Sequence, residues 1–174
     1  MKITCIEHPT EQDWMACKER ALVTVGLKAV NPPTEEWRKS ILKARHSPIR
    51  RLRFSFLLED IPSWVSVHLV RHIHAQPYVK SQRNDRQSKY DRRKAPQDAP
   101  VIMDWWISAE EIITVSHKRL CMQASEETRE IIRILMAKIE EACPEFQGLL
   151  RPLCEYRNGM CSEFHPCGRA KVIE

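Results

Sequence analysis

Apolar and polar residues in the first quarter of the chain follow a strand period and then a helix period. Lys2–Ile6 alternates and predicts a short strand. Thr10 followed by Asp13 is typical of a helix start, and the Asn-Pro-Pro sequence at 31–33 predicts where that helical segment ends. A second, short helix with a threonine at its cap position is predicted over 34–44.

The segment Ile49–Leu58 has the clearest alternation in the chain. Leucine and phenylalanine occupy every second position from 52 to 58, while Arg51 and Arg53 fall between them. This pattern predicts a half-buried strand with a basic outer face. Pro62 suits the first turn of the following helix, which leads directly into Arg71–His74.

The C-terminal half contains two capped helices and an irregular tail. Ser108 with Glu111 is a capping-box pattern for a helix predicted to reach about residue 120. A serine at 125 caps the next helix, which Pro144 ends. No periodicity follows Pro152, so we expect a single domain over 1–174 whose last part, 152–174, is a cysteine-rich tail.

Between Ala75 and Pro100 neither period occurs, so a long and therefore functional loop is predicted. The net charge of +5 is concentrated here. Such a cluster favours a phosphate-bearing partner, and a solvated basic loop is the alternative. The cations between 80 and 94 are Lys80, Arg83, Arg86, Lys89, Arg92, Arg93 and Lys94.

The composition of the chain excludes several classes of protein as readings of this sequence. The four glycines lie too far apart for a dinucleotide-binding or phosphate-binding loop. No apolar run approaches the roughly 20 residues of a membrane-spanning helix, and residues 1–10 do not resemble a secretion signal. We therefore expect no membrane partner and a cytoplasmic location, in a bacterium or a phage-infected host cell.

The seven cysteines are an odd number without a secretion signal, which argues against a disulfide framework. Cys154, Cys161 and Cys167 crowd the tail, with His165 between the last two. Three thiolates and one imidazole can complete a tetrahedron, so these four residues are the predicted zinc ligands. Free thiols are the alternative.

The stretch from Arg71 to Arg83 is the most informative for function. Arginine binds phosphate through a planar fork of donors. A helix that ends in Arg71-His72, followed ten residues after Arg71 by Ser81 and then Arg83, can place both cations on one anionic ligand. Ordinary surface salt bridges are the alternative for both arginines.

This stretch resembles the signature of the flavin-dependent thymidylate synthases, the ThyX family: Arg-His-Arg, seven residues, Ser, then x-Arg. Two further matches are the His46-Ser47-Pro48 entry to Phe54-Ser55-Phe56, and Arg119 placed ahead of Ala-x-x-Glu-x-Arg. The resemblance covers about 44–88 and 108–152, and marks the chain as a short, divergent member.

The resemblance implies an α+β fold with a mixed or antiparallel sheet and packed helices. It implies an enzyme, usually a homotetramer, that binds FAD where subunits meet and methylates dUMP to dTMP. Methylenetetrahydrofolate donates the carbon, NADPH is the reductant, the reduced flavin supplies the hydride, and an arginine polarises the uracil ring.

Carried onto this sequence, the resemblance gives each residue a role. Arg119 is the catalytic residue that activates the pyrimidine. The substrate residues are His68, Ser81, Gln82, Arg83 and Arg119, and the FAD residues are Arg51, Arg71 and His72. The expected partners are dUMP and further copies of the chain.

The sequence also departs from the family pattern, and more at flavin contacts than at nucleotide contacts. Ile73 replaces an arginine, Val79 a glutamate and Asn84 a tyrosine. The other departures are Ser108, Glu110 and Thr114 near the flavin, and His68 at a substrate-contacting glutamine position.

These departures keep other functions open. One is a relative that binds nucleotide but has altered or lost its flavin chemistry. Another is a nucleic-acid-binding protein that uses the basic loop, although Tyr78 and Tyr90 are the only candidates there for an aromatic stacking ladder. A purely structural protein is the third.

Overall fold

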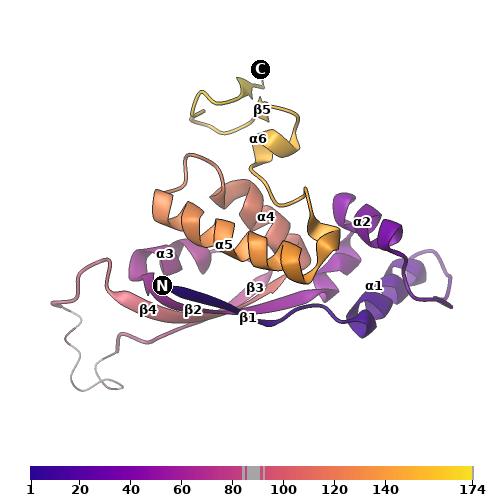
Figure 1. The fold of residues 1–174 in the computed structure, drawn as a ribbon, viewed down its shortest axis with the longest axis horizontal. Helices are drawn as coiled ribbons and strands as arrows, with labels where there is room; N and C mark the ends of the chain where they lie inside the picture. The colour runs from indigo at the N-terminus through magenta and orange to yellow at the C-terminus, as the bar shows by residue number, and fades with distance from the viewer. Residues whose placement is uncertain (84, 86–90, 92, 174) are drawn as a thin grey trace.

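The computed structural model describes residues 1–83, 85, 91 and 93–173. Its centre is a four-stranded antiparallel sheet in the order β1-β2-β4-β3 (Figure 1). The chain is therefore an α+β protein with an antiparallel sheet, as expected. The strands are β1 (Lys2–Glu7), β2 (Arg53–Pro62), β3 (Ala75–Val79) and β4 (Pro100–Ser108).

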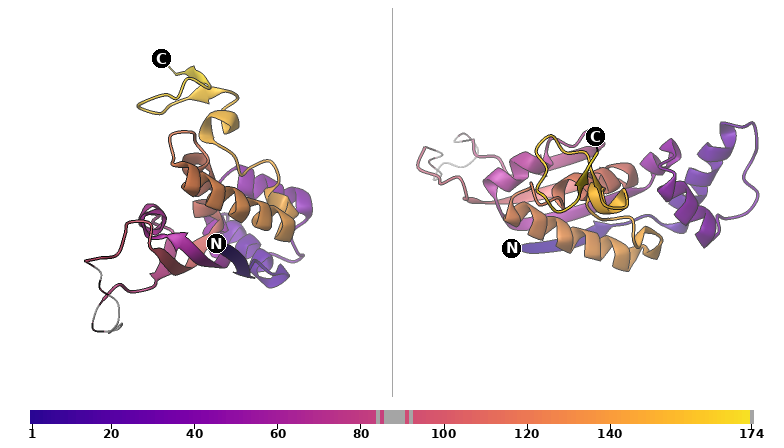
Figure 2. Two further views of the ribbon diagram at one scale, coloured as in Figure 1. Left: turned by 60° about the vertical axis from the view of Figure 1, so that its left-hand side comes forward. Right: turned by 90° about the horizontal axis from the view of Figure 1, so that it is seen from above.

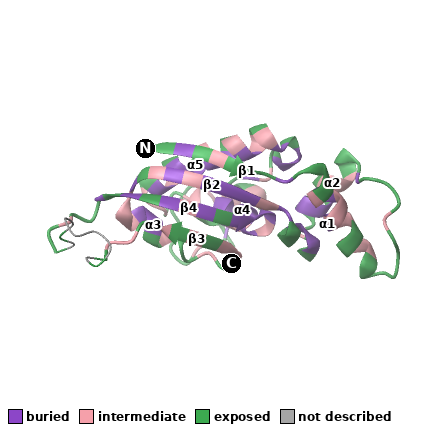
Figure 3. Cartoon of the chain, turned by 90° about the horizontal axis from the view of Figure 1, so that it is seen from below, coloured by how far each residue is buried: buried purple, intermediate pink, exposed green. Residues whose placement is uncertain are grey.

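Helices cover one face of this sheet, and the opposite face has no helix over it in the described part of the chain (Figures 1 and 3). α3 (Ser63–Leu69), α4 (Ala109–Arg119) and α5 (Glu126–Ala142) form the covering layer. The remaining elements are α1 (Glu11–Val23), α2 (Glu35–Lys43), the 3-10 turns η1 (Ser47–Arg51) and η2 (Pro144–Phe146), α6 (Leu153–Tyr156), and the short parallel pair β5 (Met160–Cys161) and β6 (Lys171–Val172).

The core lies between the sheet and its helices. Phe54 and Phe56 of β2 are almost fully buried with their rings stacked, and Phe146 meets Phe54 edge-on. On the neighbouring strand β4, Met103 and Trp105 are buried on the same face of the sheet. Burying such large side chains is the main stabilising contribution, at roughly 1.5–3 kcal/mol for each.

The predicted helix starts at Thr10, Thr34 and Ser125 are confirmed. The Thr10 hydroxyl accepts the Asp13 N–H at 3.3 Å, and the Asp13 carboxylate accepts the Thr10 N–H at 3.0 Å. Thr34 and Ser125 cap α2 and α5 through side-chain oxygens. Because each cap satisfies a backbone donor that the helix leaves free, sequence signals located these boundaries well.

Three predicted boundaries need correction. The first helix ends at Val23, well before the break at 31–33. β2 starts at Arg53 because 47–51 wind into a 3-10 turn, and it runs on to Pro62. Pro62 is the residue before α3 and not part of its first turn.

Two strands lie where alternation predicted none. β3 is a short edge strand that contains Pro77, and proline is tolerated at a sheet edge because its missing donor faces no neighbour. β4 buries Val101, Met103 and Trp105 but also carries Ile102 and Trp106 on its other face. A strand that is apolar on both faces loses its alternation. The predicted 75–100 loop therefore begins and ends in strands.

No described helix combines the length and the apolar character needed to cross a bilayer.

Candidate functional site

The turn after α3 brings the signature residues against α4. α3 ends at Leu69, and residues 70–74 turn back toward the sheet. The His74 carbonyl accepts the Ser108 N–H at 3.1 Å, which ties this turn to the first residue before α4. The turn that carries Arg71 and His72 is thereby bonded to α3 at its start and to the residue before α4 at its end.

Three side chains form a continuous hydrogen-bonded chain at this junction. The His72 Nδ1 lies 2.8 Å from a Glu111 carboxylate oxygen, and Arg119 Nε donates to His72 Nε2 at 3.3 Å. Because Nε2 accepts from a guanidinium, Nδ1 must carry the ring proton and donate it to Glu111. His72 is therefore a bridge between a carboxylate and an arginine. Both His72 and Glu111 are under a tenth exposed.

Glu111 is the anchor of this chain. Its second oxygen accepts the His74 N–H at 3.2 Å, so both oxygens are used. Burial alone would raise the pKa of Glu111, but the hydrogen bonds from His72 and the His74 backbone outweigh it and hold that pKa below its ordinary value. The carboxylate is thus charged near neutral pH and fixes the orientation of His72.

Two hydrogen bonds fix the Arg119 guanidinium and leave some of its N–H donors without a partner. Besides the contact with His72, its Nη2 donates to the His68 carbonyl at 2.9 Å. A guanidinium has five N–H donors, so three remain for a ligand. Burial and the neighbouring charge of Arg71 lower the pKa of Arg119 from its ordinary value. The direction of this shift is what a second cation near Arg119 would produce.

Within the described part of the chain, neither arginine of this junction forms a direct ion pair, and the carboxylate of Glu111 reaches Arg119 only through His72. Among the described residues no carboxylate pairs with Arg71 or Arg119. His68 lies nearby, and burial together with both arginines lowers its pKa, so its imidazole is neutral near pH 7. Two guanidinium groups without a direct carboxylate partner, beside a neutral His68, form a site that attracts an anion.

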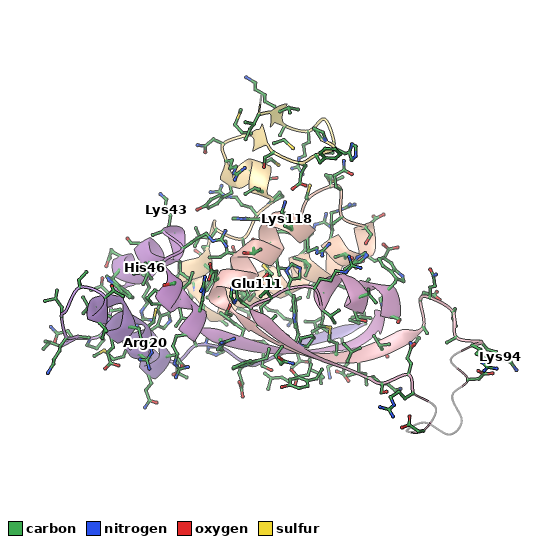
Figure 4. All side chains as sticks on the ribbon, turned by 180° about the vertical axis from the view of Figure 1, so that it is seen from behind. Arg20, Lys43, His46, Lys94, Glu111 and Lys118 are labelled. Atoms are coloured by element: carbon green, nitrogen blue, oxygen red, sulfur yellow. The ribbon has the colours of Figure 1, made fainter. Side chains whose placement is uncertain are left out.

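A pocket of about 270 Å³ opens at Arg119. Figure 4 shows Lys118 of α4 near this region, on the side of Glu111 that faces the tail. The lining residues are His72, Lys118, Arg119, Cys121, Gln123, Ala124 and Glu163. The volume is slightly below the roughly 300 Å³ at which ligand pockets usually begin.

The structure brings together only part of the predicted site. His68, Arg71, His72 and Arg119 share this junction. The Ser81 hydroxyl instead accepts the Arg83 N–H at 3.2 Å, and Gln82 contacts Ser63 at 3.4 Å.

Arg83 and Arg51 also contact residues outside this junction. Arg83 forms a two-pronged ion pair with Asp85 at 2.9 and 2.6 Å. Arg51 pairs with Asp13 at 3.4 Å. Figure 4 shows Lys94, at the far end of the basic segment, well away from Glu111. Arg86, Lys89, Tyr90, Arg92 and the predicted departure at Asn84 lie outside the described residues.

The predicted zinc ligands Cys154, Cys161, His165 and Cys167 do not form a metal site: the three cysteines line one cavity, and His165 is not among its lining residues. Across 1–83, 85, 91 and 93–173, no three His, Cys, Asp or Glu side chains are already placed to hold a metal ion. The His165 ring packs on Phe164 at 4.6 Å, and its carbonyl accepts Gln123 Nε2 at 2.7 Å. His165 is therefore held by stacking and by its backbone, and its role as the fourth ligand is not supported.

Glu111 is the functional residue that sequence reasoning missed. The capping-box pattern is only half correct: the Ser108 hydroxyl accepts the Glu111 N–H at 3.3 Å, but the Glu111 carboxylate reaches across to His72. A signal did exist, because Glu111 stands directly before Ile112 and Ile113 on the buried side of α4. A carboxylate in that position needs a buried partner.

Comparison with known proteins supports the fold. No family model matches the sequence, and no curated protein matches it. Two crystal structures of the thymidylate synthase ThyX from Helicobacter pylori, both with FAD and dUMP, resemble this structure. One has a TM-score of 0.68 and 13% identity, over 86% of this chain and 99% of that chain. The other has a TM-score of 0.67 and 15% identity, over 87% and 100%. The fold is that of a ThyX-type thymidylate synthase.

Proposed function

We propose that the protein is a flavin-dependent thymidylate synthase that methylates dUMP to dTMP. The observation that carries the proposal is the Glu111–His72–Arg119 chain, which presents a pinned arginine to a pocket on a ThyX-type fold. Methylenetetrahydrofolate is the proposed carbon donor and NADPH the proposed reductant.

Arg119 has the properties that pyrimidine activation needs. Its contacts to His72 and to the His68 carbonyl fix the guanidinium before substrate arrives, and three donors remain for the ring. A donor fixed in advance stabilises negative charge that develops on a carbonyl oxygen without reorganising at the moment of reaction. Because Arg119 is half-buried, that interaction is weakened little by water.

The anionic parts of the ligands match the uncompensated charge at this junction. Arg71 is exposed and has no carboxylate partner among the described residues, which suits a phosphate or pyrophosphate group. FAD would lie against Arg71 and His72, and Arg51, which pairs with Asp13 away from this junction, is the proposed contact for its phosphates. When bound, FAD would supply the hydride for the methylation.

Some proposed dUMP ligands lie away from Arg119 within one chain, which suggests that a second copy completes the site. Ser81, Gln82 and Arg83 are proposed dUMP ligands, yet none of them lines the Arg119 pocket of the same chain. The Arg83–Asp85 pair is well exposed on both sides, and such pairs contribute only about 0–1 kcal/mol. Arg83 can therefore exchange Asp85 for a phosphate on a neighbouring subunit. We propose a homotetramer of this kind.

Three measurements test the proposal. Purified protein should show the yellow absorption of bound flavin. It should also convert dUMP to dTMP when methylenetetrahydrofolate and NADPH are both supplied. Light scattering that found only monomer would contradict the proposal that two subunits share the site.

A second candidate is a nucleotide-binding relative whose flavin chemistry has changed. Ile73, at the position where the family signature has an arginine, is 86% exposed, and Val79 of β3 stands where a glutamate is expected. Glu110, at another flavin-side position, forms an ion pair with Arg50. Colourless protein that still bound dUMP but formed no dTMP would support this candidate instead.

A further inference from the structure

Four of the seven cysteines line one small cavity between the end of α4 and the tail. The cavity has a volume of about 20 Å³. Cys121 comes from the turn after α4, and Cys154, Cys161 and Cys167 come from the tail. All four are free thiols. Space for roughly one water-sized sphere suits a single ion and excludes an organic ligand.

His117, which lines the same cavity, has a buried ring nitrogen with no partner in the described part of the chain. His117 is 4% exposed, and its ring lies 4.6 Å from that of Tyr156. Its Nε2 is buried and makes no hydrogen bond. Buried polar atoms almost always have a partner, so this nitrogen indicates that a group belongs in the cavity beside it.

The tail also has too little apolar burial to explain its order. Figures 1 and 2 show it on the side of the helices that faces away from the sheet. Between 152 and 173 Cys161 is the only buried residue, and Phe164 is 91% exposed. A segment that folds without a core usually needs a covalent or metal cross-link.

We propose that Cys121, Cys154, Cys161 and Cys167 bind one zinc ion as four thiolates, and that His117 Nε2–H donates to one of the sulfurs. Thiolates are preferred ligands of zinc, and a closed tetrahedral set is typical of structural sites. The thiols are not yet in ligating positions. Binding therefore requires the side chains to turn into the cavity and release their protons.

This site would link the tail to the substrate pocket. Cys121 and Glu163 line both the cysteine cavity and the pocket at Arg119. Lys118 forms an ion pair with Glu163 at 2.8 Å, which already joins α4 to the tail. Zinc would thus fix one wall of the pocket, and the site stands whether or not the proposed reaction is correct.

The experiment measures zinc in the full-length protein purified without chelator, by elemental analysis. We expect stoichiometric zinc in the parent protein and its loss in Cys121→Ser and Cys167→Ser. Cys5→Ser, which changes a half-buried thiol of β1 outside the cavity, should keep the metal. Cobalt substitution adds a second readout, because charge-transfer absorption reports how many thiolates bind. Circular dichroism checks that each variant retains its helices.

The fourth ligand is decided by two more variants. His165→Ala and His117→Gln should both retain zinc. Loss of zinc in either variant, with retention in Cys121→Ser, would overturn the four-thiolate assignment. Metal-free parent protein that also fails to bind added zinc or cobalt would overturn the site altogether.

Discussion

The His72–Glu111 contact and the Arg83–Asp85 contact both join a basic side chain to a carboxylate, but their surroundings differ. The first pair is 9% and 7% exposed and continues to Arg119. The second is 64% and 56% exposed and joins residues only two positions apart. Breaking a buried contact leaves an unsatisfied group, at about 1–3 kcal/mol, whereas an exposed pair contributes about 0–1 kcal/mol.

The difference separates two jobs within the proposed site. The buried chain can hold Arg119 in one orientation because His72 and Glu111, which anchor it, are almost entirely shielded from water. The exposed pair can hold nothing rigidly, but its arginine is free to leave for a better anion. We therefore expect substitutions in the buried chain to change turnover and stability, and substitutions in the exposed pair to change affinity.

The largest effect should come from Arg119→Ala. Losing a donor fixed in advance toward a developing oxyanion raises a barrier by roughly 3–4 kcal/mol, or about two to three decades in rate. The loss of its two hydrogen bonds should cost only about 1–3 kcal/mol of folding stability. Steady-state dTMP formation and urea unfolding measure the two quantities separately. Arg133→Ala, an exposed arginine of α5, is the control. Near-normal turnover in Arg119→Ala would remove it as the activator.

The second effect should come from Arg83→Ala. A hydrogen bond to a charged group contributes about 1.5–3 kcal/mol, so dUMP affinity should fall by about tenfold to a hundredfold. Folding stability should change by no more than about 1 kcal/mol, because the Asp85 pair is exposed. Calorimetric titration with dUMP gives the affinity. Arg93→Ala, in the same basic segment, should have a clearly smaller effect. An equal loss in both variants would indicate a general electrostatic effect without a specific contact.

The third effect concerns folding. Glu111→Gln should destabilise the protein by about 1–3 kcal/mol near pH 7, since His72 and the His74 N–H lose a charged acceptor. The folded-state pKa of Glu111 is lowered, so its contribution is present above the ordinary glutamate range and is lost as the pH falls through the folded-state value. The gap between parent and variant should therefore narrow on acidification.

Urea unfolding at several pH values measures this gap. Glu110→Gln is a matched control one position away, because Glu110 pairs only with the half-exposed Arg50. It should cost under about 1 kcal/mol. A Glu111→Gln effect no larger than that of the control would mean that the buried chain does not anchor His72.

The same contrast explains what could be predicted from the sequence. Thr10, Thr34 and Ser125 were correctly assigned as caps because a cap depends on residues three positions apart. β4 was not predicted as a strand, because it is apolar on both faces and so lacks the alternation that marks a strand locally. The antiparallel α+β fold followed from the family resemblance and is confirmed.

Site residues followed the same rule. Arg71, His72 and Arg119 stand in motifs, and the structure brings them together. The partnership of Glu111 with His72 spans 39 positions and is invisible to local patterns. The sequence spacing pointed to His165 as the partner of the tail cysteines, whereas it is Cys121 that lines a cavity with them, and only the fold brings it there.

The smallest expected effect comes from changing Asp85, the carboxylate of the exposed pair. Asp85→Asn removes the group that competes with nucleotide for Arg83. If Arg83 must leave Asp85 to bind phosphate, the variant should bind dUMP more tightly, by at most about fivefold, since an exposed pair contributes about 0–1 kcal/mol. Folding stability should fall by no more than the same amount. Calorimetric titration at two salt concentrations tests this, because the gain should shrink when salt screens the exposed charges. Weaker binding in Asp85→Asn would show that Asp85 positions Arg83 for the nucleotide, and the exposed pair would then act as the buried one does.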